Sequence, residues 1–510
     1  MNRQQLKEKL TERYSQENWK KILQFIFPNV ALFQIPKEIP VTNDKVESFR
    51  QLGNVRLNDG KSLAIFDVQL NQETDIKRNR VELRNLTAKY IDQTTTHGVL
   101  AVFTSDLDDY RFTFTAKDTE FDENMELVTT QTEAKRYTYV LGPNESCKTP
   151  AERFFKLHET KDSVQLENII DAFSVDKLNK EFFNKYKEIY EKFVQFLTGK
   201  RFKKASGKWK EVKIHEPYKY LSTVFENDSK LARDYVKKLL GRMVFLQFLQ
   251  KKGWMGCSIQ NSNWEDGDPV FCRNLFKSAD QKQFHSNYLS KLFDALNTPE
   301  RENNIFEITN SRVPYLNGGL FEADIDLIRQ MDFPASHFES LLNFFGEYNF
   351  TIDENDPNDH EVGIDPEMLG HIFENLLEDN KDKGAFYTPK PIVQYMCQES
   401  LIQYLKTHLG DDNNAIENFI RTFDKGDEKD PNNYILQNAK RIEELLDKVK
   451  ICDPAIGSGA FPMGLLQIIY RAKMTLDWTL DPAEVKRGII QNSIYGVDID
   501  KGAVDIARLR

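Results

Sequence analysis

The segment that constrains this chain most is a glycine-rich turn between an expected strand and an expected helix. Residues 453–461 read Asp-Pro-Ala-Ile-Gly-Ser-Gly-Ala-Phe, after the hydrophobic Val449 and Ile451 and before an apolar helix expected at 463–470. Glycine lets the backbone approach a ligand closely and adopt a positive φ without strain. Such a turn at the carboxyl end of a parallel strand is typical of nucleotide-binding sites. The segment therefore predicts a Rossmann-like α/β domain.

A second strand is expected at residues 494–498, Ile-Tyr-Gly-Val-Asp. Its last residue, Asp498, stands where a carboxylate at the end of the second strand holds a pair of ribose hydroxyls. The plainer alternative is a generic Rossmann turn for some other nucleotide.

The spelling of the turn closely resembles motif I of the amino-group (N6-adenine) DNA methyltransferases, which bind S-adenosylmethionine. Residues 384–389, Gly-Ala-Phe-Tyr-Thr-Pro, followed by 392–396, resemble motif X of that family, and 496–500 resemble motif II. The order X, I, II is that of the family's gamma arrangement. The cofactor-binding residues that this resemblance implies are Thr388, Pro389, Asp453, Pro454, Ala455, Gly457, Gly459 and Asp498.

The resemblance also implies roles for these residues. Asp498 would hold the ribose, and Thr388, Pro389 and Asp453 would line the methionine end of the cofactor. The family's catalytic motif, Asn-Pro-Pro-Tyr or Asp-Pro-Pro-Tyr, does not occur in the 510 residues. A doubly wound sheet also needs more than two strands. We therefore expect the N-terminal part of a longer protein, truncated within its methyltransferase domain.

The N-terminal region has a different pattern. Helices are expected within residues 4–27, a β-hairpin around Asn58-Asp59-Gly60, a helix at 76–91 and strands at 98–103 and 110–114. This order of helices and strands resembles the core of the PD-(D/E)xK nuclease fold. Such nucleases hold Mg²⁺ with carboxylates on neighbouring strands and position a water molecule for attack on a phosphodiester.

The nuclease resemblance places a catalytic pair on the second strand of the hairpin. Asp67 would be a Mg²⁺ ligand and a catalytic residue, and Gln69 would orient water. An ordinary solvent-facing residue of an alternating strand explains Asp67 equally well. The second carboxylate of the Mg²⁺ site is not identified by the sequence. The candidates are Asp44, Glu47, Asp59 and the acid-x-Lys triplet Asp75-Ile76-Lys77. On the neighbouring helix, Arg78, Arg80 and Arg84 are candidate phosphate contacts.

Composition bounds the architecture. A chain of 510 residues with 40% hydrophobic and 29% charged residues predicts a soluble protein of about three domains. We expect a nuclease-like domain at 1–175, a helical connector at 176–350 and the first part of a methyltransferase domain at 351–510. There is no apolar run long enough to cross a membrane and no signal peptide. The five scattered cysteines lack metal-ligand spacing, so reduced thiols in a cytoplasmic protein are expected.

One short region is positively charged, although the chain as a whole has a net charge of −10. Residues 200–213 are strongly basic, with Phe202 and Trp209 interleaved. A loop of this composition could track phosphates, and a merely solvated loop is the alternative.

Further matches at 136–142, 151–154, 316–321 and 364–374 extend the resemblance over essentially the whole chain, to large fused (type IIG-like) restriction–modification proteins. The resemblance implies methyl transfer from S-adenosylmethionine to adenine N6 of double-stranded DNA, with cleavage of unmodified DNA and a role in phage defence. Its implied partners are the rest of the methyltransferase and a target-recognition domain. The alternatives are a DNA-binding defence or specificity subunit with a degenerate nuclease core, and one half of a split methyltransferase.

Overall fold

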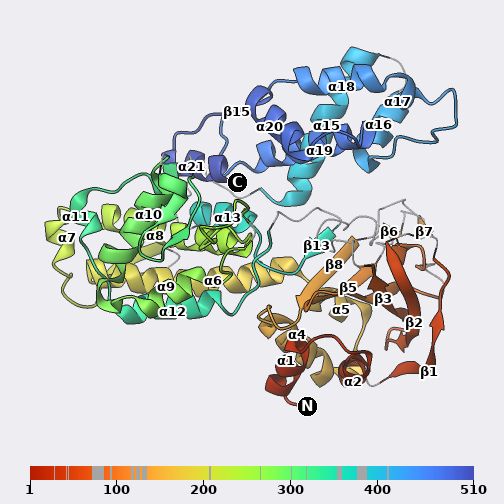
Figure 1. Ribbon diagram of the computed structural model, residues 1–510, viewed down its shortest axis with the longest axis horizontal. Helices are drawn as coiled ribbons and strands as arrows, with labels where there is room; N and C mark the ends of the chain where they lie inside the picture. Colours follow the sequence, from red (N-terminus) through yellow and green to blue (C-terminus); the bar gives the residue numbers. More distant parts are fainter. Residues whose placement is uncertain are drawn as a thin grey trace. The chain divides into compact units, whose positions relative to one another are not determined.

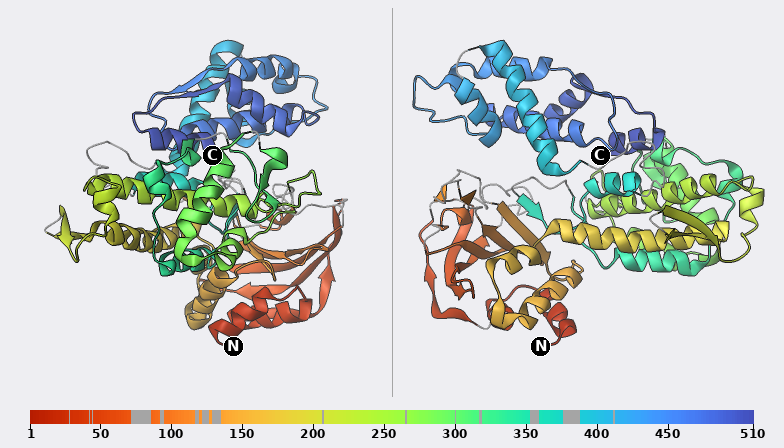
Figure 2. Two further views of the ribbon diagram at one scale, coloured as in Figure 1. Left: turned by 60° about the vertical axis from the view of Figure 1, so that its left-hand side comes forward. Right: turned by 180° about the vertical axis from the view of Figure 1, so that it is seen from behind.

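The computed structural model describes the chain except residues 28, 42, 44, 72–85, 92–94, 117–119, 122–126, 129–134, 206–207, 265, 300, 317–318, 353–358, 376–387 and 411–412. The chain forms two compact units. The first comprises Met1–Glu188 and Phe338–Asp365, and the second comprises Ile189–His337 and Pro366–Arg510. Figures 1 and 2 show the course of the chain. No helix among the described residues combines the length and the apolar character needed to cross a bilayer.

The first unit is built on a mixed sheet whose described strands lie in the order β1-β2-β3-β4-β5-β8-β13. The strands are β1 (Val30–Glu38), β2 (Val46–Arg56), β3 (Ser62–Leu70), β4 (Gly98–Thr104), β5 (Tyr110–Ala116), β8 (Lys135–Leu141) and β13 (Asp359–Glu361). The pairs β3–β4 and β8–β13 are parallel, and the other neighbours are antiparallel. The hairpin predicted around Asn58-Asp59-Gly60 is therefore confirmed as the β2–β3 connection.

Both faces of this sheet are covered. On one face, Phe49, Phe66 and Phe103 join a buried cluster with Leu86 and Ile91. The other face packs against α2 (Gln16–Ile26), α4 (Lys148–Glu159) and the end of α5 (Leu166–Ala172), because Phe112 contacts the rings of Trp19, Phe154 and Phe173. Helix α1 (Arg3–Thr11) precedes α2 and packs on α4. Because both faces are buried, β3 and β4 are apolar almost throughout, as expected of central strands.

The middle of the chain is helical, as predicted. Its helices are α6 (Val175–Thr198), α7 (Tyr220–Thr223), α8 (Ser229–Lys251), α9 (Phe271–Ser278), α10 (Ser290–Asn297), α11 (Asp326–Arg329), α12 (Ala335–Phe345) and α13 (Glu367–Asn375), with the short turn η5 (Gly319–Phe321). Helix α8 is buried nearly all round from Tyr235 to Leu249, which confirms the prediction of a core helix. The basic region at 200–213 is not a loop as expected. It is an antiparallel hairpin of β9 (Lys200–Ala205) and β10 (Lys208–Lys213).

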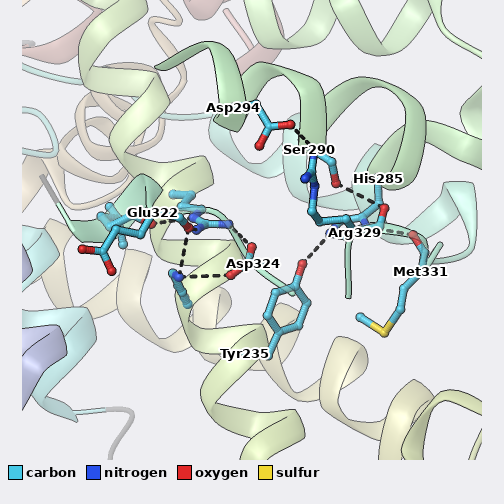
Figure 3. A network of polar contacts seen from close by, with 11 residues as sticks. Tyr235, His285, Ser290, Asp294, Glu322, Asp324, Arg329 and Met331 are labelled. Carbon is cyan, nitrogen blue, oxygen red and sulfur yellow. Dashed lines mark hydrogen bonds and ion pairs between the residues drawn. The ribbon is translucent and has the colours of Figure 1, made fainter. Parts of the chain in front are cut away.

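A buried polar network joins α8 to its neighbours (Figure 3). Arg242 donates from Nε to the Leu320 carbonyl (2.6 Å) and from Nη2 to the Glu322 carbonyl (2.8 Å), and it pairs with Asp324. This arrangement satisfies the guanidinium, which is otherwise costly to bury, and it fixes the 320–324 segment on α8.

The C-terminal part of the second unit contains the two strands predicted at either side of the glycine-turn helix. Strands β14 (Ile451–Asp453) and β15 (Ile494–Gly496) are parallel neighbours. The helices are α15 (Lys390–Leu409), α16 (Asn413–Thr422), α17 (Tyr434–Gln437), α18 (Ala439–Lys448), α19 (Ala460–Leu476), α20 (Pro482–Asn492) and α21 (Lys501–Leu509). The apolar faces of α15 to α20 form one core cluster. Helix α15 approaches α19 closely because Gly464 presents no side chain to Val393 and Cys397.

Candidate cofactor site and nuclease-like pocket

The glycine turn has the backbone that the sequence predicts. It connects β14 to α19, and Gly457 and Gly459 have φ of +52° and +87°. Gly459 is the left-handed N-cap of α19. A Cβ on Gly459 would lie 3.1 Å from the Cβ of Ala507 on α21. The turn therefore needs glycine at this position for both its conformation and its packing.

Four of the predicted site residues, Asp453, Ala455, Gly457 and Asp498, come together at this turn. Asp498 accepts hydrogen bonds from the Gly457 N–H at Oδ2 (2.8 Å) and from the Asp500 N–H at Oδ1 (2.9 Å). Asp453 accepts from the Ala455 N–H at Oδ1 (3.0 Å). The Val497 N–H donates to the Asp453 carbonyl (2.9 Å), which fastens the end of one strand to the other. The carboxylates of Asp453 and Asp498 thus flank the turn from neighbouring parallel strands.

One acceptor of this site stands out. Asp453 Oδ2 is a buried oxygen without a hydrogen-bond donor among the described residues. A buried acceptor left without a partner costs about 1–3 kcal/mol, more when it is charged. The negative charge of Asp453 also reaches Cys397, whose pKa is raised to about 12 by burial and, to a lesser degree, by this carboxylate. A bound cationic group would satisfy the oxygen.

The segment at 384–389, which resembles motif X, is described only in part. Residues 384–387 lie outside the described residues. Thr388 and Pro389 immediately precede α15, where Pro389 is the N-cap residue. The structure also brings to the turn one residue that sequence analysis missed. Arg510, the residue after α21, donates from Nη1 to the Ser458 carbonyl (2.9 Å), a contact that no motif could have revealed.

Asp67 and Gln69 line one pocket of about 400 Å³ in the first unit. Only 1% of Asp67 is exposed, so the alternative of a solvent-facing residue is wrong. Asp67 Oδ2 accepts from Gln16 Nε2 (2.8 Å) and lies 3.5 Å from Arg50 Nη2. Asp67 Oδ1 is buried without a donor among the described residues. Burial and the charge of Asp67 together raise the pKa of Tyr14, which lines the same pocket.

The described residues around Asp67 do not form a divalent-metal site. Arg50, a cation, lies directly opposite Asp67 on β2, where a second carboxylate would be useful. No three His, Cys, Asp or Glu side chains gather for a metal in the described parts of the chain. Asp59 instead serves the hairpin turn, since its Oδ1 accepts from the Lys61 N–H (3.2 Å), while its Oδ2 accepts from the Leu166 N–H (3.0 Å). Asp44, 75–77, Arg78, Arg80 and Arg84 lie outside the described residues.

Comparison of the chain with models of protein families gives no match. Over 361 residues, 63% of its length, the chain is 32% identical to a protein of Methanocaldococcus jannaschii named "Putative type II restriction enzyme and methyltransferase". The resemblance to a restriction–modification protein is confirmed. The chain spans 29% of that relative's length.

A solved structure also matches. It is that of the Type IIL restriction–modification enzyme MmeI in complex with DNA, with a TM-score of 0.33 and 17% identity. The match covers 53% of this chain and 32% of the MmeI chain.

Proposed function

We propose that this chain supplies the cofactor-binding part of an N6-adenine DNA methyltransferase, joined to a nuclease-like unit in a restriction–modification enzyme that acts on double-stranded DNA. The observation that carries the proposal is the turn where Asp453, Gly457 and Asp498 meet. The M. jannaschii relative, which is named as both a restriction enzyme and a methyltransferase, supports it.

The residues of the turn fit S-adenosylmethionine. Each Asp498 oxygen uses one acceptor site within the loop, and a carboxylate has about four. The remaining sites can accept from two ribose hydroxyls. The unpaired Asp453 Oδ2 suits the ammonium of the methionine end, and the glycines leave room for close approach. When bound, the cofactor would supply an electrophilic methyl group on its sulfonium, and the target adenine would be flipped out of the duplex.

Titration of S-adenosylmethionine into this chain tests the proposal. Asp498→Ala should weaken binding by about 2–4 kcal/mol, because two charge-assisted hydrogen bonds are lost at roughly 1.5–3 kcal/mol each, less some relaxation. Asp481→Ala is the matched control, since Asp481 also accepts backbone N–H bonds, at the start of α20 and away from the turn. Equal affinity of Asp498→Ala and wild type would remove Asp498 from the site.

DNA cleavage at the pocket of Asp67 and Gln69 is a second candidate function. The unpaired Asp67 Oδ1 supports it, because a buried carboxylate oxygen of this kind can take part in binding Mg²⁺ with a substrate phosphate. The Arg50 partner favours the opposite alternative, a nuclease-like core kept for DNA binding. Plasmid cleavage with Mg²⁺ or EDTA, by the wild-type protein and its Asp67→Asn variant, separates the two. Cleavage by both proteins alike would place the metal elsewhere.

A further inference from the structure

The β9–β10 hairpin in the helical part of the second unit is the most basic segment of the chain. Residues 200–213 contain Lys200, Arg201, Lys203, Lys204, Lys208, Lys210 and Lys213, and Glu211 is their one acid. The whole chain has a net charge of −10, so this concentration of positive charge is unusual within it. The predicted loop is instead an ordered two-stranded ribbon, which holds its charges at fixed intervals.

The strand register sorts these charges onto two faces, because directly opposed residues of an antiparallel pair share a face. One face takes the pairs Lys200–Lys213 and Phe202–Glu211, and the other takes Arg201–Val212 and Lys203–Lys210. The only acid of the hairpin therefore lies on the first face. The charged residues of the second face are all cations, and we call this face the cationic face.

Three charged residues of the first face, Lys200, Glu211 and Lys213, are already engaged. Glu211 accepts from Lys200 Nζ (3.0 Å) and from Arg233 Nη1 (2.6 Å). Although partial burial opposes ionisation, these hydrogen bonds hold the pKa of Glu211 below its usual value. Lys213 pairs with Glu216. These contacts use Lys200 and Lys213 within the protein.

Where its side chains are described, the cationic face is open to solvent. Arg201 and Lys210 are both exposed, and the residues opposite them in the register are Val212 and Lys203 rather than acids. Along one strand, residues of one face recur about every 7 Å. A regular row of cations on a ribbon suits a row of phosphates, and a two-stranded ribbon is narrow enough for the major groove of DNA.

We propose that the cationic face of the β9–β10 hairpin, centred on Arg201 and Lys210, binds the phosphate backbone of duplex DNA. This inference rests on the proposed function only in its choice of polyanion. It adds to that function a sequence-independent DNA contact in the helical part of the chain. Phosphate contacts of this kind position DNA and carry no sequence information.

The test measures binding of a random 30-base-pair duplex by fluorescence anisotropy at several salt concentrations. Arg201→Ala/Lys210→Ala should lower the slope of log K against log salt by about 2, at about 0.9 per phosphate contact. The control Lys213→Ala/Lys425→Ala removes the same net charge from lysines that pair with Glu216 and Glu428, and should keep the wild-type slope. An unchanged slope in the first variant, or an equal loss in the control, would overturn the proposal.

Two further measurements separate this proposal from the proposed function. S-adenosylmethionine affinity should be equal in wild type and Arg201→Ala/Lys210→Ala, which also verifies that the variant is folded. If neither wild type nor Arg201→Ala/Lys210→Ala binds S-adenosylmethionine, the proposed methyltransferase function is contradicted. The hairpin proposal is then judged by the salt dependence of DNA binding alone. Tighter binding of single-stranded RNA than of duplex DNA, lost in the same variant, would overturn the choice of duplex DNA.

Discussion

At the scale of single residues, His285 is a buried group whose ionisation is coupled to folding. Its Nδ1 lies 2.7 Å from the Met331 carbonyl, which can only accept, so Nδ1 carries the proton and Nε2 accepts from the Tyr235 hydroxyl. Burial lowers the pKa of His285 to about 4. The unfolded chain, with a pKa near 6.5, binds a proton that the folded state does not.

Stability should therefore fall as pH drops below about 6.5. The contribution of His285 is complete above the unfolded pKa and is lost progressively toward pH 4, reaching a loss of about 2 kcal/mol by pH 5. Denaturant unfolding of wild type and His285→Gln between pH 5 and 7.5 measures it. The variant should be less stable at pH 7.5 but less sensitive to pH. Parallel pH profiles for the two proteins would contradict the assignment.

Gly459 should matter for both stability and cofactor binding. Alanine there must adopt φ near +87°, at a cost of about 1–2 kcal/mol, and must push against Ala507. Gly410 is a matched control, since it has φ of +83° with no atom within 4 Å of an added Cβ. Both alanine variants should lose stability in denaturant unfolding. Only Gly459→Ala should also weaken S-adenosylmethionine binding, and equal affinity of both would contradict the role of the turn.

Residue types at the turn were predictable from sequence, whereas the partners of Asp67 were not. The spelling of 453–461 determines where positive φ occurs, because only glycine adopts it readily. Arg50 faces Asp67 because the β2–β3 register shifts between Gln51 and Gly53. Irregularities of this kind leave no local pattern in the sequence, so a guanidinium opposite the carboxylate could not be foreseen.

At the scale of elements, helix α8 organises the helical part through Arg242. Arg242→Lys should destabilise the protein by about 3–5 kcal/mol, because a lysine cannot replace three directed contacts and leaves buried acceptors unpaired. The control is Arg421→Lys, on a partly exposed side chain paired with Glu399 and Glu417, which should cost less than about 1 kcal/mol. Equal midpoints of denaturant unfolding in the two variants would contradict this role.

Elements with strong periodic patterns were predictable, and edge elements were not. The buried runs of α8, β3 and β4 leave clear apolar patterns. Strand β1 was missed because it is an edge strand with few buried side chains and a proline. The β9–β10 hairpin was missed because its lysines mask any alternation.

At the scale of the whole molecule, the first unit is discontinuous in sequence. Phe338–Asp365 returns to it through β13, which pairs with β8, and Glu361 meets Arg111 at 3.2 Å in a buried ion pair. Contacts between residues this far apart in the sequence cannot be read from composition or periodicity. The division of the chain at 175 and 350 stays a prediction based on the resemblance.

The whole chain should bind S-adenosylmethionine yet fail to methylate DNA by itself. Among the described residues, the sheet at the candidate cofactor site has only β14 and β15, and the 510 residues lack the Asn-Pro-Pro-Tyr or Asp-Pro-Pro-Tyr acceptor that would orient adenine N6. Beyond β15, Val497 and Ile499 are 62% and 92% exposed, which is unfavourable for apolar side chains. Transfer of a radiolabelled methyl group to unmodified genomic DNA should stay at background while calorimetry detects cofactor binding in the same sample.

Adding a separate chain that carries the missing motif and strands should restore transfer if the two parts assemble. Methylation by this chain without any partner would show that the acceptor lies within the 510 residues and that the expected downstream motif is not required.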